Sequence, residues 1–440
     1  MLLKKTAAAA FCVMLLSAQM PVSAADMTWS YDEESATVSV KGYGMINDAT
    51  QLKQYLDRAK RINVLGGVTK IDRNVFTDCG NVEEVILPDG FLSVGDNSFS
   101  MSKSLKTINF PDTLESIGNE AFMGCSSLEN VTIPKSVSSI GKNAFGECVN
   151  VKEFKVSEEN SIYSEIDGII FSKDGTELIL YPPGMEAESY AVPENVTKVH
   201  NSAFAYNPYI TEITFPDSTA EIDDYAFYFC DRLKSVSFGS GLKKIGNYSF
   251  YGAKQKNVKL PYGTEYIGNN AFKNCEKLIT ADIPGTVTFI GENAFYGTNK
   301  ELFIRGYGDT VKKYADAESK NYYNSVRVQL DGKELEFDQP AIIDNDYTMV
   351  PMRKIFEALG AVVEWDNSTK TAYGKKDGIT CSIKIGDSKL YKNSETIELA
   401  APAKIINGKT LVHIRAIAEA FGARVDWDSG TGLVTIASNN

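Results

Sequence analysis

Few residues in this chain of 440 residues could carry chemistry. It has only two histidines, His200 and His413. His413 lies in TLVHIRAIAEAFGARVDWD (residues 410–428), beside an arginine, several carboxylates and a tryptophan. A metal or oxidase site would need several imidazole or thiolate ligands close together, and no Cys-x-x-Cys pair occurs. The sequence therefore predicts no catalytic residue, no metal and no cofactor, and we expect a protein that is not an enzyme.

The segment around His413 is present twice. PAIIDNDYTMVPMRKIFEALGAVVEWD (residues 340–366) aligns with PAKIINGKTLVHIRAIAEAFGARVDWD (residues 402–428) at a constant offset of 62. Each copy is typical of a hairpin, a helix and a second hairpin. The position of His413 is Pro351 in the first copy. We therefore interpret His413 as a packing residue and not as a ligand.

Both copies also keep an arginine and a tryptophan. Arg353 and Arg415 lie in the first turn of a predicted helix, where a cation gains nothing from the helix dipole. We predict that each arginine bonds a nearby carboxylate, such as Asp366 or Asp428. The alternative is that they bind an acidic surface polymer. Trp365 and Trp427 are interpreted as core residues, with a sugar platform as the alternative.

A second pattern fills the chain from residue 71 to 297. A phenylalanine recurs, mostly every 23 residues, at Phe76, Phe99, Phe122, Phe145, Phe204, Phe227, Phe250, Phe272 and Phe295. A fixed period of this length predicts a solenoid, in which each turn is stable only when its neighbours cover it.

Two intervals depart from the period. The interval between Phe145 and Phe204 is 59 residues, and Asp174-Gly175 between two apolar runs predicts a hairpin there. The turn after Phe250 is one residue short, and it carries Gln255 and Lys256 where other turns have leucine. We expect this turn to be more loosely packed.

Five cysteines share one slot, three residues after the phenylalanine: Cys79, Cys125, Cys148, Cys230 and Cys275. Other turns place Ser, Asn, Ala or Thr in this slot. The pattern indicates a small packing residue. A disulfide between adjacent turns, which only Cys125 and Cys148 could form, is the alternative.

Tyrosines are concentrated in the second half of the repeats. Tyr225 and Tyr248 hold equivalent positions in neighbouring turns, as do Tyr228 and Tyr251, and Tyr296 has the same position two turns later. Equivalent positions stack roughly 5 Å apart, so these five tyrosines are candidate ligand-binding residues along one edge. The alternative is stacking that only stabilises the solenoid.

The repeats, as in IGNEAFMGCSSLENVTIPKSVSS (residues 117–139), resemble the BspA-like leucine-rich repeat family. The resemblance implies a cap over residues 25–62, repeats over 63–303 with a hairpin insertion at about 157–190, and a second cap over 304–326. Residues 327–440 resemble the copper amine oxidase N-terminal-like, or stalk, domain. The expected fold is mainly β: a leucine-rich-repeat solenoid with N- and C-terminal caps, then a small α+β domain built from the duplicated hairpin, helix and hairpin unit.

The N-terminus is typical of a signal peptide over residues 1–24, with two lysines, an apolar run and Val22-Ser23-Ala24 before the cleavage point. We expect a secreted or surface-associated protein, with no membrane span after signal cleavage. The net charge is −12, without basic clusters, so nucleic acid is not an expected partner.

The resemblance implies an exported bacterial surface or secreted binding protein, or adhesin. Its solenoid would recognise an extracellular protein or glycan, and its C-terminal domain would present it or attach it to the cell wall. The alternative is a structural envelope or matrix component without a specific soluble ligand.

Overall fold

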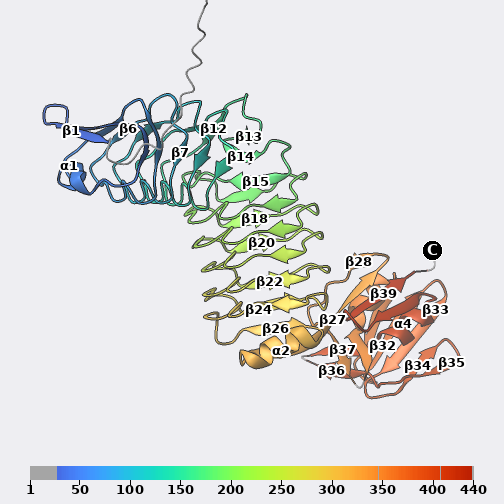
Figure 1. The fold of residues 1–440 in the computed structure, drawn as a ribbon. Coiled ribbons are helices and arrows are strands. Elements are labelled where there is room, and N and C mark those ends of the chain that lie inside the picture. The colour runs from blue at the N-terminus through green and yellow to red at the C-terminus, as the bar shows by residue number, and fades with distance from the viewer. Residues whose placement is uncertain (1–26, 345, 407, 439–440) are drawn as a thin grey trace, which may run out of the picture.

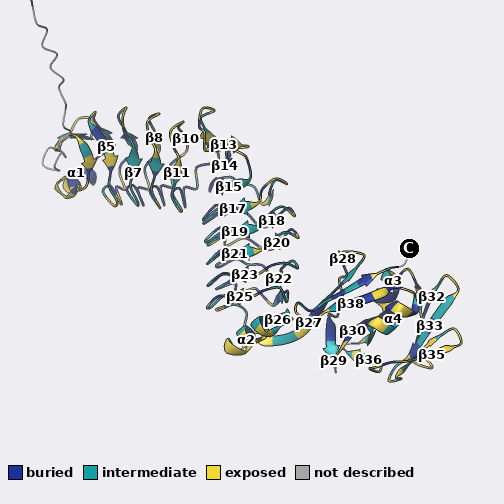
Figure 2. Ribbon diagram, turned by 45° about the vertical axis from the view of Figure 1, so that its right-hand side comes forward, coloured by how far each residue is buried: buried dark blue, intermediate teal, exposed yellow. Residues whose placement is uncertain are grey.

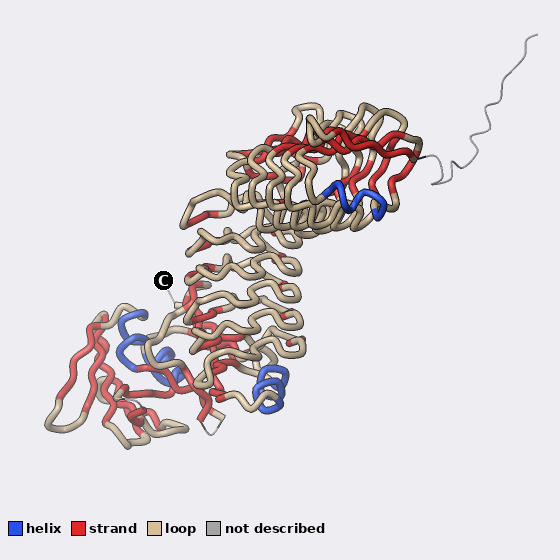
Figure 3. Tube along the Cα trace, turned by 90° about the vertical axis from the view of Figure 1, so that its left-hand side faces the viewer, coloured by secondary structure: helices blue, strands red, loops and turns tan. Residues whose placement is uncertain are grey.

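The computed structural model of the chain describes residues 27–344, 346–406 and 408–438. The predicted signal peptide over residues 1–24 lies outside these ranges. The described chain forms a long solenoid that bends once near its middle, and a β-rich domain follows its C-terminal end (Figure 1). The turns of both arms stack as parallel coils (Figure 3). The predicted fold class, mainly β with a solenoid and a smaller second domain, is confirmed.

Each turn contributes two short strands, one to each of two rows, because apolar and polar residues alternate there. In β10 (Val131–Ile133), Val131 and Ile133 are buried and Thr132 is exposed. Before the bend, the other strands of the first row are β2 (Thr37–Lys41), β4 (Arg61–Val64), β6 (Glu84–Ile86), β8 (Thr107–Asn109) and β12 (Phe154–Val156). The second row there consists of β3 (Gly44–Ile46), β5 (Val68–Ile71), β7 (Ser93–Val94), β9 (Ser116–Ile117) and β11 (Ser139–Ile140).

The same two rows continue after the bend. The first row consists of β16 (Ser189–Ala191), β18 (Glu212–Thr214), β20 (Ser235–Ser237), β22 (Asn257–Lys259), β24 (Thr280–Ile283) and β26 (Phe303–Gly306). The second row consists of β15 (Glu177–Leu180), β17 (Lys198–Val199), β19 (Glu221–Ile222), β21 (Lys244–Ile245), β23 (Tyr266–Ile267) and β25 (Phe289–Ile290). Neighbouring strands of the second row pair in parallel, as β17 does with β19.

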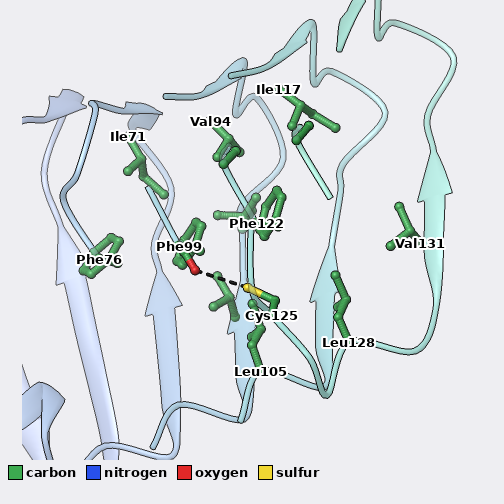
Figure 4. Packing of buried hydrophobic residues seen from close by; sticks show 14 of the residues in the cluster. Ile71, Phe76, Val94, Phe99, Leu105, Ile117, Phe122, Cys125, Leu128 and Val131 are labelled. Atoms are coloured by element: carbon green, nitrogen blue, oxygen red, sulfur yellow. Dashed lines mark hydrogen bonds between the residues drawn. The ribbon is translucent and has the colours of Figure 1, made fainter. Parts of the chain in front are cut away.

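The nine repeat phenylalanines form the interior of the solenoid, and each is buried. Before the bend, the rings of Phe99 and Phe122 stack with centroids 5.4 Å apart and planes within 5° (Figure 4). After it, Phe227 and Phe250 stack at 5.1 Å and within 2°. We call this series the phenylalanine column. Its rings cover one another, which explains why a single turn would have no stable core.

The bend lies at the predicted hairpin insertion. Strands β13 (Tyr163–Ile166) and β14 (Ile169–Ser172) pair antiparallel, and β14 then pairs with β15 across the Asp174-Gly175 turn. Tyr181 at the end of the insertion is buried and stacks on Phe204 at 4.6 Å. It thus takes the place of a repeat phenylalanine, which the sequence analysis missed because the insertion changes the spacing. In the described residues β11 pairs only with β9, and β12 pairs only with β10, so strand pairing within both rows is interrupted at the bend.

Caps close both ends of the solenoid. At the N-terminus, β1 (Thr28–Asp32) pairs with β2. A 3-10 turn η2 (Thr50–Leu52) and the short helix α1 (Lys53–Leu56) complete this cap. At the C-terminus, helix α2 (Asp309–Ala317) covers the last turn with its buried Val311 and Ala315.

The C-terminal domain continues directly from the solenoid. Strand β27 (Asn321–Leu330) pairs with β26 at its start and with β28 (Lys333–Glu334), β29 (Ala341–Asp344) and β39 (Leu433–Ala437) further along. The first copy of the duplicated unit continues with β30 (Tyr347–Pro351), α3 (Met352–Ala358), β31 (Val362–Asp366) and β32 (Thr371–Lys376). The second copy consists of β36 (Lys404–Ile406), β37 (Lys409–His413), α4 (Ile414–Ala420), β38 (Arg424–Asp428) and β39.

Three more strands, β33 (Ile379–Lys384), β34 (Lys389–Lys392) and β35 (Glu395–Glu398), extend β31 and β32 into a five-stranded sheet. Both helices pack their buried faces toward the interior of the domain (Figure 2). Each unit is therefore a hairpin, a helix and a second hairpin, as the internal alignment predicted.

Candidate functional site

The cysteine slot is a packing position of the interior. All six described cysteines are buried and free, so Cys125 and Cys148 are not bonded to each other. The Cys125 thiol donates to the carbonyl of Phe99 in the preceding turn, with an Sγ to O distance of 3.2 Å (Figure 4). Ser102 makes the same bond to Phe76 at 3.4 Å. Burial raises the pKa of the Cys125 thiol to about 12, so the thiol is protonated at neutral pH, as expected of a packing residue.

His413 ends β37 and packs within the C-terminal domain. Its ring meets the ring of Tyr347 edge-on, with centroids 5.2 Å apart. Burial, and then the charge of Arg415, lower the pKa of the imidazole. In the described ranges no group of three or more His, Cys, Asp or Glu side chains could hold a metal ion.

The two equivalent arginines differ, and neither bonds the carboxylate that we predicted. Arg415 donates from Nη1 to the carbonyl of Val425 at 2.9 Å, so it joins α4 to β38 through a backbone group. Asp366 and Asp428 instead accept bonds from the turns that follow them. The predicted pairing with Asp366 or Asp428 is therefore wrong, because these aspartates cap their own hairpin turns. Arg415 does have a carboxylate neighbour, Glu419 of the same helix at 3.5 Å.

The candidate binding surface is a group of exposed or half-buried rings just after the bend. We call it the aromatic patch: Tyr206, Tyr225, Tyr228, Phe229, Tyr248 and Tyr251. Tyr225 and Tyr248 stack with centroids 5.0 Å apart and planes within 5°. Tyr228 and Tyr251 also lie 5.0 Å apart, tilted by 38°. Four of the five predicted tyrosines thus lie together.

Tyr296, the fifth, lies apart from the patch. The turn between Tyr251 and Tyr296 has Lys273 at the equivalent position, and Lys273 Nζ lies 5.6 Å from the centre of the Tyr296 ring. The tyrosine series is therefore interrupted by a cation. The Tyr251 hydroxyl accepts a bond from Asn274 Nδ2 at 2.7 Å, which fixes the last ring of the patch.

Sequence reasoning missed two rings. Phe229 lies 5.0 Å from Tyr251, and Tyr206 lies 5.8 Å from Phe229. Both stand two residues after a repeat phenylalanine, a position that holds glycine, asparagine, aspartate, glutamate or methionine in the other turns. An aromatic residue at this position, in two neighbouring turns, was the signal that could have identified them.

Four of the six patch residues have left-handed backbone conformations: Tyr206, Tyr225, Phe229 and Tyr248. Each solenoid turn has left-handed residues two before and two after the phenylalanine, and these positions hold glutamate or methionine in other turns, as at Glu120 and Met101. A side chain other than asparagine or glycine there costs on the order of 1–2 kcal/mol. The left-handed positions are therefore a property of the repeat, and the clustering of rings is what distinguishes the patch.

The patch is neutral at physiological pH. Burial raises the pKa of Tyr206 to about 12, and burial also raises the pKa of Tyr225 and Tyr228. Phe229 keeps 37% of its surface exposed. The patch thus offers ring faces and neutral hydroxyl groups, which suit a sugar ring or an apolar protein surface.

Across the described residues, every helix is too short or too polar to cross a bilayer.

Comparison with known proteins finds two family models. The BspA type leucine-rich repeat region matches residues 55–176 and 184–303 in six copies, together more than half of the chain. The copper amine oxidase N-terminal domain matches residues 329–436. A curated protease inhibitor of Brevibacillus choshinensis is 32% identical over 108 residues, which is 23% of this chain and 31% of that protein.

Two solved structures are similar in fold. The pneumococcal vaccine antigen PcpA is 19% identical, with 68% of this chain and 96% of that chain covered at a TM-score of 0.51. A leucine-rich cell surface protein of Faecalibacterium prausnitzii is 22% identical, with 70% and 95% covered at a TM-score of 0.48.

Proposed function

Because this chain belongs to the BspA-type leucine-rich repeat family, we propose that it is an exported bacterial surface or secreted binding protein. Its solenoid recognises an extracellular protein or glycan through the aromatic patch. The C-terminal domain presents the solenoid or attaches it to the cell wall. The observation that carries this proposal is the gathering of six exposed or half-buried aromatic rings on three neighbouring turns, with Tyr225 and Tyr248 stacked at 5.0 Å and Phe229 37% exposed. Clustered aromatic side chains of this kind are typical of binding surfaces.

The joint between the two parts supports the presenting role. Arg327 of β27 donates to the carbonyl of Leu260 in the solenoid. The Tyr262 hydroxyl bonds Thr431 Oγ1 at 2.8 Å, from solenoid to C-terminal domain. Tyr307 of the C-terminal cap meets Trp427 edge-on at 5.5 Å. These contacts, together with the continuous strand β27, hold the solenoid in a fixed direction from its base.

The test is binding of the full chain to intact animal and bacterial cells and to a panel of purified glycans. We expect saturable binding to one ligand class. Replacing Tyr225, Tyr228 and Tyr251 together by serine should weaken it about tenfold or more, as expected when central aromatic contacts are lost. Tyr266→Ser is the matched control, since Tyr266 stacks on Phe289 at 4.7 Å and not on the patch.

Unchanged binding by the triple variant, with only a lower melting temperature, would mean that the patch is structural. The second role, a structural envelope component, would instead show co-sedimentation with cell walls through residues 327–440 and no saturable ligand for the solenoid.

A further inference from the structure

The duplicated domain contains two grooves at positions related by the internal repeat. One has a volume of about 230 Å³ and is lined by Tyr347, His413, Arg415 and Trp427, among others. The other has a volume of about 880 Å³ and is lined by Lys409, Pro351, Arg353 and Trp365, the residues at the equivalent positions. We call them the closed groove and the open groove. The two copies thus share one backbone arrangement but leave grooves of very different volume.

Side-chain differences account for the contrast. In the closed groove the rings of Tyr347 and His413 pack against each other, 5.2 Å apart. In the open groove, lysine replaces the tyrosine and proline replaces the histidine. Lys409 forms an ion pair with Asp338. No pair of rings therefore fills the open groove.

The arginine that both copies share forms hydrogen-bond and ion-pair contacts in the closed groove but, within the described residues, not in the open groove. Arg415 bonds the Val425 carbonyl and lies 3.5 Å from Glu419. Arg353 is exposed, and the described part of the chain provides it with neither a hydrogen bond nor an ion pair. The same holds for Lys354, its neighbour on α3. A guanidinium with five unused donors is suited to a carboxylate.

The charges that line the open groove balance, with three cations and three carboxylates: Arg353, Lys354, Lys409, Glu336, Asp338 and Glu357. Glu336 is paired with Lys259 at 2.8 Å, and Asp338 is paired with Lys409. Arg353 and Lys354 are the cations of the groove whose donors are unused among the described residues. The chain as a whole has a net charge of −12, so a groove without a negative excess differs from the average of the chain.

An exposed aromatic ring stands beside these cations. Trp365, which we interpreted from the sequence as a core residue, instead keeps 39% of its surface exposed, and Ile405, which also lines the groove, keeps 55%. In the closed groove the equivalent Trp427 is covered by Tyr307 from the solenoid. An indole with a free face stacks well against the C–H face of a sugar ring.

We infer that the open groove binds a carboxylate-bearing glycan chain. One sugar ring lies against Trp365, and its carboxylate is bound by Arg353 and Lys354. A peptide adding to a strand edge is less well suited, because β36 beside the groove is only three residues long and offers few backbone groups. This inference deepens the proposed attachment role of the C-terminal domain, since it assigns that role a site and a ligand class.

The experiment uses the full chain and three polymers: oligogalacturonate, which has carboxylates on sugar rings; dextran, which has uncharged rings; and polyglutamate, which has carboxylates on a peptide. Binding is measured by affinity electrophoresis and by quenching of tryptophan fluorescence. We expect binding to oligogalacturonate only. Arg353→Ala and Trp365→Ala should each weaken it about tenfold or more, and Trp365→Phe should retain part of it.

Arg415→Ala is the matched control in the closed groove, and it should lower the melting temperature without changing the affinity for oligogalacturonate. Equal affinity for polyglutamate, insensitivity to Arg353→Ala, or the absence of binding to oligogalacturonate would each overturn the inference. Co-sedimentation of the Arg353→Ala and Trp365→Ala variants with purified walls separates the two proposals. Retained wall binding would leave the attachment role intact and place it outside this groove.

Discussion

The solenoid contains two series of aromatic rings that differ in where their side chains lie. Phe227 belongs to the buried phenylalanine column, with a ring that stacks on Phe204 at 4.7 Å and on Phe250 at 5.1 Å. Phe229, two residues later, belongs to the exposed aromatic patch. The column is nearly parallel in its stacking, whereas the patch mixes stacked, tilted and edge-on contacts.

The column and the patch place aromatic side chains in two different settings, one buried between turns and one at the surface. Every repeat needs a ring in the column, because each turn is stable only when its neighbours cover it. The patch extends over only three turns, and its rings are exposed or half-buried. The column therefore explains the stability of the solenoid, and we propose that the patch serves binding.

The largest expected effect comes from breaking the column beside the patch. Phe227→Ala should lower the free energy of unfolding by about 3–5 kcal/mol, because it removes a fully buried ring. Phe229→Asn should change it by less than about 1 kcal/mol, since the lost ring contacts are offset by relief of the left-handed strain. Urea unfolding of both variants measures the contrast, and equal losses would contradict the assignment of the two series.

A smaller effect is expected at Gln255. This side chain fills a leucine position of the solenoid and is 1% exposed, and neither of its amide atoms has a partner among the described residues. Phe250 and Phe272 still stack with ring centroids 5.3 Å apart, so the short turn leaves no gap between neighbouring turns. The departure in this turn, which we expected to be loosely packed, is instead a buried amide without hydrogen bonds in the described part of the chain. Gln255→Leu should stabilise the chain by about 1–3 kcal/mol. Thermal unfolding measures this, and a loss of stability would show that the short turn cannot hold leucine.

The smallest stability effect is expected at Tyr181, the one tyrosine in the column. Its hydroxyl is buried without a hydrogen-bond partner in the described structure, so Tyr181→Phe should stabilise the chain by about 1 kcal/mol at pH 7. A melting temperature that stays the same or falls would contradict this, and would imply that the hydroxyl is satisfied in solution.

The same residue gives a pH dependence. Burial raises the pKa of Tyr181 to about 12, above the ordinary value of about 10. The folded state favours the neutral phenol, so this contribution is fully present below pH 10 and is lost as pH rises from about 10 to 12. Tyr181→Phe should therefore lose less stability than the parent chain over this range, as unfolding at a series of pH values would measure. Tyr206, whose pKa burial also raises to about 12, remains in both proteins. The loss of stability between pH 10 and pH 12 should therefore be smaller in the variant but not absent.

Periodicity made the column predictable, because residues 23 apart meet the same neighbours in every turn. The two-copy domain was predictable for the same reason. Tyr181 was not, since the insertion before it removed the spacing that identifies a column residue. Phe229 and Tyr206 were missed because the sequence analysis followed the tyrosine positions one after and two before the phenylalanine, and these two rings join the patch from the position two after it.

The C-terminal domain shows a further limit of prediction from the internal sequence alignment. The alignment paired Arg353 with Arg415 correctly but could not show that they differ in their bonding. Arg415 bonds a backbone carbonyl, which no side-chain pattern reveals. The open and closed grooves arise from contacts between the two copies, so they became visible only when both were seen folded together.

The most direct test of the central claim, that the aromatic patch receives the partner, is site-specific photo-crosslinking on intact cells. A benzophenone amino acid replaces Phe229 in one sample and Phe289 in the other, two rings with similar exposure of 37% and 42%. We predict a cross-linked product from position 229 that unlabelled full chain competes away, and none from position 289. Equal products from both positions, or a product from position 289 alone, would contradict the account.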